Sequence, residues 1–261
     1  MNKLMCHIYF GDPNPEFSIK LAQTLLDSGA DGLEIGIPYS DPVADGVVFQ
    51  NACKRALKNG MNPDEVLRGI GKIRETGCTQ PIYITSYYAP IFTMGEEQFV
   101  LRAKESGANG LIIPDLLFEE QKTLRSFCNQ QGLSLIQFAT PYTSKQRLRM
   151  IAQKAKDFLY CIGAPSVTGK TVYTTEQKVV LIKKITKELG LLKKDIPLMI
   201  GFGISQATEV QELIATGVDG VIVGSAIARI YEKHLDNPEK ALPKIASFIK
   251  AMKKATIGGD L

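Results

Sequence analysis

Two carboxylates near the start of the chain have the types and spacing that acid–base chemistry requires. Glu34 lies in the segment 31–37, where apolar residues alternate with a period of two, and this alternation predicts a strand. The apolar residues share one face of that strand, so Glu34 points to the other face, where its neighbours are glycines. Asp45 lies at the far end of the loop that the turn-forming run 38–42 predicts. Two acids on one strand–loop unit favour a site for proton transfer.

A pair of glycine-rich turns near the C-terminus has the pattern of an anion site. The segment 201–205 follows one predicted strand, 224–227 follows the next, and each is expected to run straight into a helix. Glycines let the backbone approach an anion, and the first turn of a helix offers unpaired N–H groups. Barrels of parallel strands hold phosphate after their seventh and eighth strands, so these turns favour a phosphate site. The other interpretation is that the glycines only allow tight packing of the turns.

Two aromatic residues, Phe202 and Tyr160, each allow two interpretations. Phe202, between two glycines, belongs either to the core or to a surface that packs on a substrate ring. Tyr160 lies near the end of the sixth predicted strand, where it either packs in the core or donates a hydrogen bond to a catalytic carboxylate.

The elements that must position these residues repeat along the chain. Three segments share a glycine, an Ala or Val, an Asp or Asn, a second glycine and an apolar strand. Each copy follows an amphipathic stretch, so its first glycine fits the end of a helix and the following residues begin a strand. The repeat therefore indicates successive strand–helix units. The copies are 29–35, 107–113 and 217–223.

The whole pattern predicts eight strands that alternate with helices. Eight such units in 261 residues favour a closed, single-domain (β/α)8 TIM barrel over an open doubly wound sheet, so we expect one domain over residues 1–261. The longest loops are expected after strands two and six, at 38–62 and 163–170. Besides the three repeat segments, strands are expected at 4–9, 81–86, 133–138, 158–162 and 197–201. Helices are expected at 19–28, 63–75, 97–106, 118–130, 144–154, 176–189, 207–216 and 225–234, with a last helix near 238–254.

Composition excludes several classes of protein. Hydrophobic residues make up 44% and charged residues 22%, which is typical of a globular chain and not of a disordered or fibrous one. The net charge of +4 is too small to indicate a nucleic acid or an anionic membrane as partner. No apolar run is long enough to span a membrane, and the first residues lack a signal-peptide layout, so we expect a cytoplasmic protein.

Cysteine and histidine are too few and too scattered for a metal centre. The 5 cysteines contain no CxxC pair, which argues against a disulfide framework or a zinc site. The 2 histidines, His7 and His234, exclude a histidine-rich metal site and give little support to a Ser-His-Asp triad. We therefore expect no metal ion.

The segment 33–46, LEIGIPYSDPVADG, resembles the signature E-[LI]-G-x-P-[FY]-S-D-P-x-A-D-G of the α subunit of tryptophan synthase. Gln50 and Asn51 follow it as they do in that family, and the resemblance extends over nearly the whole chain. It implies a reverse-aldol cleavage of indole-3-glycerol phosphate to indole and glyceraldehyde 3-phosphate, without a metal or cofactor in this chain. Further matches, in the same order as in the family, are GDP at 11–13, PD at 114–115, GFGI at 201–204 and GSA at 224–226.

The resemblance also implies a role for each site residue. Glu34 transfers protons to indole C3 and from the side-chain hydroxyl, while Asp45 accepts a hydrogen bond from the indole N–H as positive charge develops there. Tyr160 matches an active-site tyrosine near the glutamate, and Thr168 is expected to meet Asp45 when the loop after strand six closes. The expected phosphate contacts are Gly169, Gly203, Gly224 and Ser225, and the expected indole-facing residues are Ile112, Phe138 and Phe202.

The same resemblance implies a partner. In the family the loop that holds Pro38 and Asp41 faces a β subunit, which contains pyridoxal phosphate and receives indole through a tunnel, and an α2β2 heterotetramer is expected. For Asp41 a second interpretation stays open, because an aspartate between Ser40 and Pro42 can simply stabilise the turn.

Several positions depart from the family pattern in the loops that close the site or meet the partner. Pro165 and Ser166 alter the loop after strand six, where proline restricts the backbone. Ala89 replaces an asparagine, and Leu117 and Val47 replace prolines. The chain also begins almost at its first strand, so most of the usual preceding helix is expected to be missing.

Two functions therefore stay open. The first is a working lyase, and the second is a catalytically impaired subunit that acts mainly as an allosteric activator of the β subunit. A third option, another phosphate-binding barrel enzyme such as a sugar-phosphate isomerase, is disfavoured by the acid pair.

Overall fold

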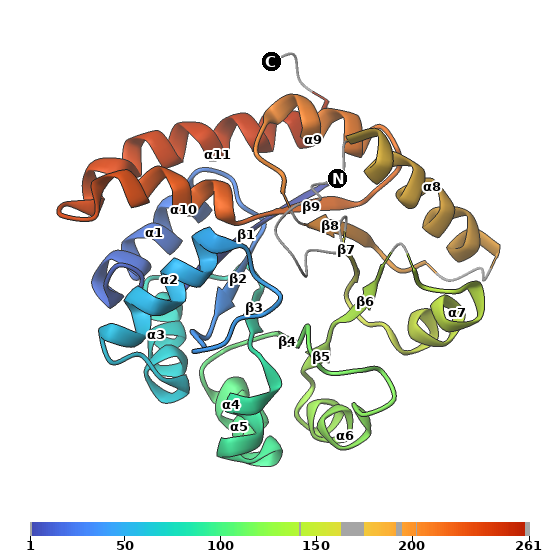
Figure 1. Ribbon diagram of the computed structural model, residues 1–261, viewed down its shortest axis with the longest axis horizontal. Helices are drawn as coiled ribbons and strands as arrows, with labels where there is room; N and C mark the ends of the chain where they lie inside the picture. The colour runs from blue at the N-terminus through green and yellow to red at the C-terminus, as the bar shows by residue number, and fades with distance from the viewer. Residues whose placement is uncertain (1, 141, 163–174, 192–194, 202, 259–261) are drawn as a thin grey trace.

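The computed structural model describes residues 2–140, 142–162, 175–191, 195–201 and 203–258. In this part of the chain nine parallel strands form one sheet in the order β5-β4-β3-β2-β1-β9-β8-β7-β6, and Figure 1 shows the helices arranged around them. The chain thus folds as the predicted (β/α)8 TIM barrel. The strands are β1 (Lys3–Tyr9), β2 (Gly32–Gly36), β3 (Ile82–Thr85), β4 (Gly110–Ile112), β5 (Ser134–Leu135), β6 (Gln137–Ala139), β7 (Leu159–Ile162), β8 (Leu198–Gly201) and β9 (Gly220–Val223).

The helices follow the strands in the expected alternation. They are α1 (Pro15–Asp27), α2 (Val47–Lys58), α3 (Pro63–Glu75), α4 (Tyr88–Met94), α5 (Glu96–Glu105), α6 (Lys122–Gln131), α7 (Lys145–Lys154), α8 (Thr175–Leu191), α9 (Ala207–Ile214), α10 (Ser225–Tyr231) and α11 (Leu242–Thr256), with 3-10 turns η1 (Glu232–His234) and η2 (Pro238–Ala241). None of the described helices is both long and apolar enough to cross a membrane.

The barrel closes through one bent strand. β5 and β6 occupy the two ends of the strand order, yet only Ile136 separates them in the chain. The Ile136 N–H donates to the carbonyl of Leu111 in β4 at 2.9 Å, while β6 pairs with β7. The predicted fifth strand is therefore present in two short pieces, and the nine strands correspond to eight strand–helix units.

Strand alternation separates an outer core from an inner layer. Leu33, Ile35 and Ile37 are fully buried in the outer core, between the strands and the surrounding helices, whereas Glu34 faces inward. Next to the polar site residues, a layer of apolar and aromatic side chains fills the inside of the barrel. It consists of Met5, Tyr83, Ile112, Ile136, Phe158, Tyr160, Met199 and Ile222.

The three repeat segments make one contact three times. In each copy the first glycine has a positive φ and ends the helix. The Asp or Asn two residues later forms hydrogen bonds with the first or second residue of the preceding strand. Its side chain accepts the N–H of that residue, while its own N–H donates to the carbonyl of the same residue. The side-chain bonds join Asp31 to Leu4 at 2.7 Å, Asn109 to Ile82 at 2.9 Å and Asp219 to Leu198 at 2.7 Å.

Two helices are absent from the sequence prediction. The expected long loop 38–62 contains α2, which buries Phe49, Cys53 and Ala56 on one face. Its N-cap is Gly46, with no side-chain cap, so the usual start signal is missing. Helix α4 begins after Tyr87, also without a side-chain cap. Conversely, α1 begins before the predicted residue 19, because Asn14 caps it at the N-terminus.

Candidate active site

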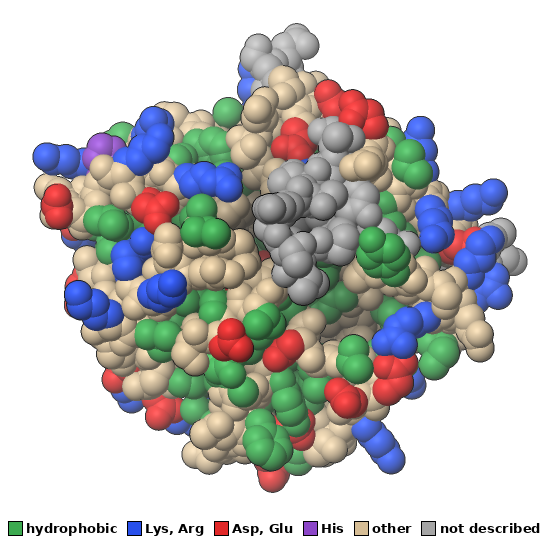
Figure 2. Space-filling model, viewed as in Figure 1, with side chains coloured by type: hydrophobic (Ala, Val, Ile, Leu, Met, Phe, Trp, Pro, Cys, Tyr) green, Lys and Arg blue, Asp and Glu red, His purple; other side chains and the backbone are tan. Residues whose placement is uncertain are grey.

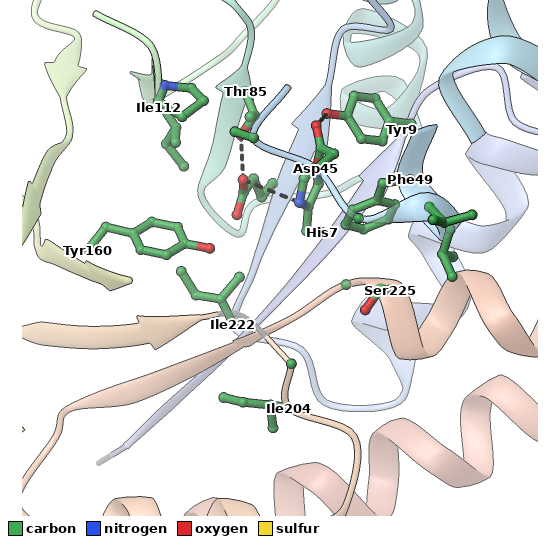
Figure 3. Close-up of a pocket in the computed structure, with 18 of the residues that line it drawn as sticks. His7, Tyr9, Asp45, Phe49, Thr85, Ile112, Tyr160, Ile204, Ile222 and Ser225 are labelled. Carbon is green, nitrogen blue, oxygen red and sulfur yellow. Dashed lines mark hydrogen bonds and ion pairs between the residues drawn. The ribbon is translucent and has the colours of Figure 1, made fainter. Parts of the chain in front are cut away.

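A cavity of about 380 Å³ opens at the carboxyl ends of the strands and brings most of the predicted site residues together. Figure 3 shows Asp45, from the loop after β2, and the rings of His7, Tyr9 and Tyr160, from β1 and β7, around it. Among the predicted residues, those that line it are Glu34, Asp45, Ile112, Phe138, Tyr160, Gly203, Gly224 and Ser225. This position matches the face on which barrel enzymes build their active sites.

Glu34 lines the cavity from β2, which lies between β1 and β3. Its Oε1 accepts a hydrogen bond from Thr85 Oγ1 at 2.5 Å, and His7 Nδ1 lies 3.4 Å from the same oxygen. Register explains both contacts, since His7 on β1 pairs with Glu34 on β2, and β3 brings Thr85 alongside. One carboxyl oxygen is thus held, and Oε2 has no hydrogen-bond partner among the described residues.

Burial sets the protonation of this pair. It raises the pKa of Glu34 to about 7, while the Thr85 hydrogen bond acts in the opposite direction. It lowers the pKa of His7 to about 4, opposed by the negative charge of Asp45. Near neutral pH Glu34 therefore exists in both protonation states, as proton transfer requires, and His7 is neutral.

Asp45 is held by two tyrosine hydroxyls. Tyr9 and Tyr87 both donate to its Oδ2 at 2.7 Å, and the Ala44 N–H donates to the Tyr87 hydroxyl oxygen at 2.9 Å. Burial raises the pKa of Asp45, and the two hydroxyl bonds partly offset that rise. Since both tyrosines bind one oxygen, Oδ1 receives no hydrogen bond from the described residues and is available to a ligand.

Tyr160 reaches the cavity because two neighbouring strands make room for rings. A Cβ atom at Gly201 would lie 2.3 Å from the Tyr160 hydroxyl oxygen, so only glycine permits this position. Similarly, a Cβ at Gly36 would lie 2.6 Å from the Tyr9 ring. Burial, with the nearby charge of Glu34, raises the pKa of Tyr160 well above its usual value, so its hydroxyl stays a donor.

The two glycine-rich turns that were predicted to bind phosphate also line the cavity, through Gly203, Gly224 and Ser225. Gly224 and Ser225 lead directly into α10, as expected, but α9 begins only at Ala207, so the turn at Gly203 does not run straight into a helix. The expectation for that turn was wrong because the residues after it form an extended connection before the helix.

Two basic side chains that the sequence analysis did not single out also line this wall. Arg229 is exposed at the cavity, in the last turn of α10. Lys178, only 2% exposed, forms an ion pair with Glu209, whose Oε2 accepts the Ser205 N–H at 3.2 Å. The ion pair therefore ties the start of α8 to the glycine turn after β8.

The remaining predicted residues lie elsewhere. Thr168, Gly169 and Phe202 fall outside the described residues, as do Pro165 and Ser166. In the loop after β2, Pro38 is buried within the chain and Asp41 is exposed. A partner at this loop would therefore contact Asp41 rather than the Pro38 side chain.

Four polar side chains of the site were missed by the sequence analysis. His7, Tyr9, Thr85 and Tyr87 all line the cavity. The alternation of β1 contained a signal for the first two, because Met5, His7 and Tyr9 share the face opposite Leu4, Cys6 and Ile8. Within the described ranges no group of three or more His, Cys, Asp or Glu could hold a metal ion. The arrangement can move protons and stabilise a developing positive charge.

The fold and the cavity define a TIM-barrel protein with two carboxyl groups in a cavity at the carboxyl ends of its strands. A family model described as tryptophan synthase alpha chain matches residues 1–257. The chain belongs to this family, whose members are lyases of tryptophan biosynthesis and whose name as an alpha chain implies a β-subunit partner.

Individual relatives agree with this assignment. The tryptophan synthase alpha chain of Halalkalibacterium halodurans is 41% identical over 259 residues, covering 96% of this chain and 94% of the relative. That of Methanocaldococcus jannaschii is 42% identical over 226 residues, covering 87% of this chain and 78% of the relative. The crystal structure of tryptophan synthase subunit alpha from Legionella pneumophila has a TM-score of 0.88 and 31% identity, covering 98% of this chain and 93% of that one.

Proposed function

We propose that this chain cleaves indole-3-glycerol phosphate to indole and glyceraldehyde 3-phosphate. The observation that carries the proposal is that one cavity holds two carboxyl groups with different surroundings, Glu34 buried and Asp45 half-buried. Glu34 has a pKa of about 7 and a free oxygen, which suits proton transfer, whereas Asp45 is fixed by two hydroxyls, which suits charge stabilisation.

The cleavage assigns different steps to the two acids. Protonation of indole C3 by Glu34 makes the ring cationic, and Asp45 accepts a charge-assisted hydrogen bond from the indole N–H. Loss of the side-chain hydroxyl proton then breaks the bond to C3 and releases the aldehyde. Tyr160, whose hydroxyl stays protonated, supports the glutamate from β7.

Substrate binding follows from the two walls of the cavity. Ile112 and Phe138, with Phe202, are proposed to face the indole ring. Gly203, Gly224 and Ser225, with Gly169, are proposed to bind the phosphate, and the positive charge of Arg229 favours the same end. Thr168 is proposed to contact Asp45 when the loop closes. No cofactor is needed in this chain, and the cytoplasm is its proposed location.

Substituting each acid tests the proposal. Glyceraldehyde 3-phosphate release is measured from indole-3-glycerol phosphate with the full chain and a cognate β subunit. Glu34→Gln is expected to lower kcat by about 100-fold or more, because the amide cannot transfer protons. Asp45→Asn is expected to lower it by about 100-fold, because the charge that stabilises the ring is lost. Asp27→Asn, an exposed substitution at the end of α1, is the control and keeps full activity.

The outcome also separates a lyase from an activator. Turnover of Glu34→Gln equal to that of the unmodified chain would contradict the assigned role of Glu34. Absence of cleavage by the unmodified chain, with normal acceleration of the β subunit, would overturn the lyase proposal in favour of an allosteric activator.

We further propose that the loop after β2 contacts the β subunit, which holds pyridoxal phosphate, in an α2β2 assembly. Large exposed apolar side chains follow β2, β3 and β4, and Figure 2 shows hydrophobic side chains at the surface among acidic ones on the face in view. Such residues are typical of a covered surface. They are Val43, Val47, Phe92 and Leu117.

Reversing the charge of Asp41 tests this contact. Asp41→Lys is expected to weaken binding of the β subunit by about 10-fold or more, because a rim charge of the wrong sign opposes association. Asp27→Lys makes the same charge change on exposed α1 and leaves the affinity unchanged. The affinity is measured by titrating the chain into a β subunit and following β activity. Equal affinities of the two variants would contradict the proposed interface.

A further inference from the structure

His7 is fixed beside Glu34 as part of the same polar cluster. Its Nδ1 lies 3.4 Å from Glu34 Oε1, the oxygen that also accepts the Thr85 hydroxyl. The imidazole ring packs against Phe49 at 4.7 Å and Tyr9 at 5.2 Å between ring centroids, so its plane is held from two sides. The dashed line at His7 in Figure 3 marks this contact with the Glu34 carboxyl group.

The other nitrogen of this ring has no hydrogen-bond partner in the described part of the chain. His7 Nε2 is buried and makes no hydrogen bond with any described residue, although His7 lines the cavity. Gly36 leaves room beside it, since a Cβ there would lie 3.1 Å from Nε2. Buried ring nitrogens are nearly always hydrogen-bonded, so an unpartnered one at a cavity wall points to a ligand atom that completes it.

We propose that His7 is a second catalytic residue, a relay that accepts the proton of the substrate's side-chain hydroxyl at Nε2 and passes its Nδ1 proton to Glu34 Oε1. Glu34 Oε2 meanwhile protonates indole C3. This role rests on the proposed cleavage and adds to it a division of labour, because the two protons of the reaction belong to different atoms of the substrate.

The step balances in protons and electrons. The C2–C3 π pair of indole takes the proton of Glu34 Oε2 and forms the C3–H bond, and the nitrogen lone pair makes the C–N double bond of the cationic ring. When Nε2 takes the hydroxyl proton, the O–H pair becomes the second bond of the aldehyde. The C3–C pair breaks and restores the C2–C3 double bond, which returns the lone pair to nitrogen. Nδ1 gives its proton to Oε1, so Glu34 ends protonated and His7 ends as the neutral Nε2–H form. Exchange with water after product release restores the starting form.

The charges around His7 agree with this starting state. The titratable groups that face it are Glu34 on β2, Asp45 in the following loop and Tyr9 on its own strand. No lysine or arginine forms an ion pair with Glu34 within the described ranges. Burial keeps the pKa of His7 at about 4, so the imidazole is neutral and able to accept a proton at neutral pH.

Two substitutions separate a relay from a residue that only holds Glu34 in place. His7→Gln offers an amide donor and an acceptor but cannot carry a proton from one atom to the other. His7→Phe keeps a ring between Phe49 and Tyr9 and removes both functions. Cleavage of indole-3-glycerol phosphate in the presence of the β subunit is measured for both, together with binding of an indolyl alkyl phosphate that lacks the hydroxyls.

The relay predicts that both variants lose about 100-fold in kcat, while the affinity for the analogue and activation of the β subunit are unchanged. It also predicts that the rate of the unmodified chain curves as D2O replaces H2O, because several protons move together, and that the curvature is absent in His7→Gln. If His7→Gln keeps the kcat of the unmodified chain, His7 is at most a positioning residue and the relay is overturned. If the unmodified chain does not cleave the substrate, both the relay and the proposed function are overturned. If instead both variants keep the kcat of the unmodified chain, only the relay is overturned.

Discussion

Glu34 carries its proton at a pH where an exposed glutamate has lost it. In the described part of the chain the groups nearest its carboxyl oxygens are a hydroxyl and a neutral imidazole, and neither supplies a full positive charge. Burial therefore dominates and raises the pKa of Glu34 to about 7. Burial of the Glu34 carboxyl group suits proton transfer, but it also means that the ionised form of Glu34 destabilises the folded chain.

Because ionised Glu34 destabilises the folded chain, the free energy of unfolding is expected to depend on pH. Below pH about 4.5 Glu34 is protonated in both the folded and the unfolded chain, and as the pH rises to about 7 only the folded chain keeps the proton. Stability from this group is therefore present at low pH and lost as the pH rises through that window. Glu34→Gln cannot ionise, so its stability relative to the unmodified chain is expected to rise between pH 5 and pH 8, by about 2.5 kcal/mol.

Urea unfolding of both proteins at the two pH values measures this difference. His7, whose lowered pKa acts in the opposite direction below its ordinary value of 6.5, remains in both proteins and largely cancels in the comparison. A difference that stays constant from pH 5 to pH 8 would show that Glu34 is ionised throughout and would contradict the raised pKa.

The two acids, Glu34 and Asp45, are easier to predict from the sequence than the residues that contact them. Glu34 and Asp45 stand out because glycines and turn formers flank them in the chain. His7 and Thr85 do not, because their roles arise from the register between β1, β2 and β3, which joins residues far apart in sequence. No local pattern contains that register, although the alternation of β1 does give the face on which His7 lies.

Among the elements of the barrel, the repeated Asp or Asn holds β2 to β1, β4 to β3 and β9 to β8. The residue satisfies the N–H at the start of the preceding strand, a group that would otherwise lack a partner at the end of the sheet. The sequence repeat thus reflects a hydrogen bond as well as the helix–turn–strand geometry that predicts it.

Asp219 is the copy best suited to a test, because its side chain bonds only to Leu198 in the described structure. Asp219→Ala is expected to lower the free energy of unfolding by about 1–3 kcal/mol, since the Leu198 N–H is left unpaired. Asp219→Asn is the matched control and is expected to lose less, because Asn109 makes the same bond in another copy. Urea unfolding measures both, and equal losses would contradict the hydrogen bond as the cause.

The elements that the sequence missed lacked local signals. Helix α2 has an amphipathic face, but a glycine N-cap and the preceding prolines favoured a loop. The bend between β5 and β6 lies in a run of apolar and β-forming residues, 133–138, that gives no sign of it. Closure of the barrel requires the bend, so tertiary structure and not local preference determines it.

At the scale of the whole molecule, α11 joins the end of the chain to its beginning. It packs against α1, α9, α10 and β1, as Figure 1 shows for the helices. Lys253 Nζ lies 2.6 Å from Asp31 Oδ2, the oxygen that also accepts the Leu4 N–H. The last helix therefore stabilises the first two strands, which hold His7 and Glu34.

Loss of packing in α11 is therefore expected to destabilise the whole barrel rather than one end of it. Ile249 is fully buried on α11, and Ile249→Ala is expected to lower the free energy of unfolding by about 2–5 kcal/mol. Ile257, just after the helix, is 54% exposed, and Ile257→Ala removes the same atoms at a cost of no more than about 0.5 kcal/mol. Circular dichroism during urea unfolding measures both, and cavity ligand binding followed in the same titration reports on the site. Because β1 lies between α11 and the cavity, Ile249→Ala should shift both transitions together; loss of helix signal before loss of binding would show that α11 unfolds independently of the site.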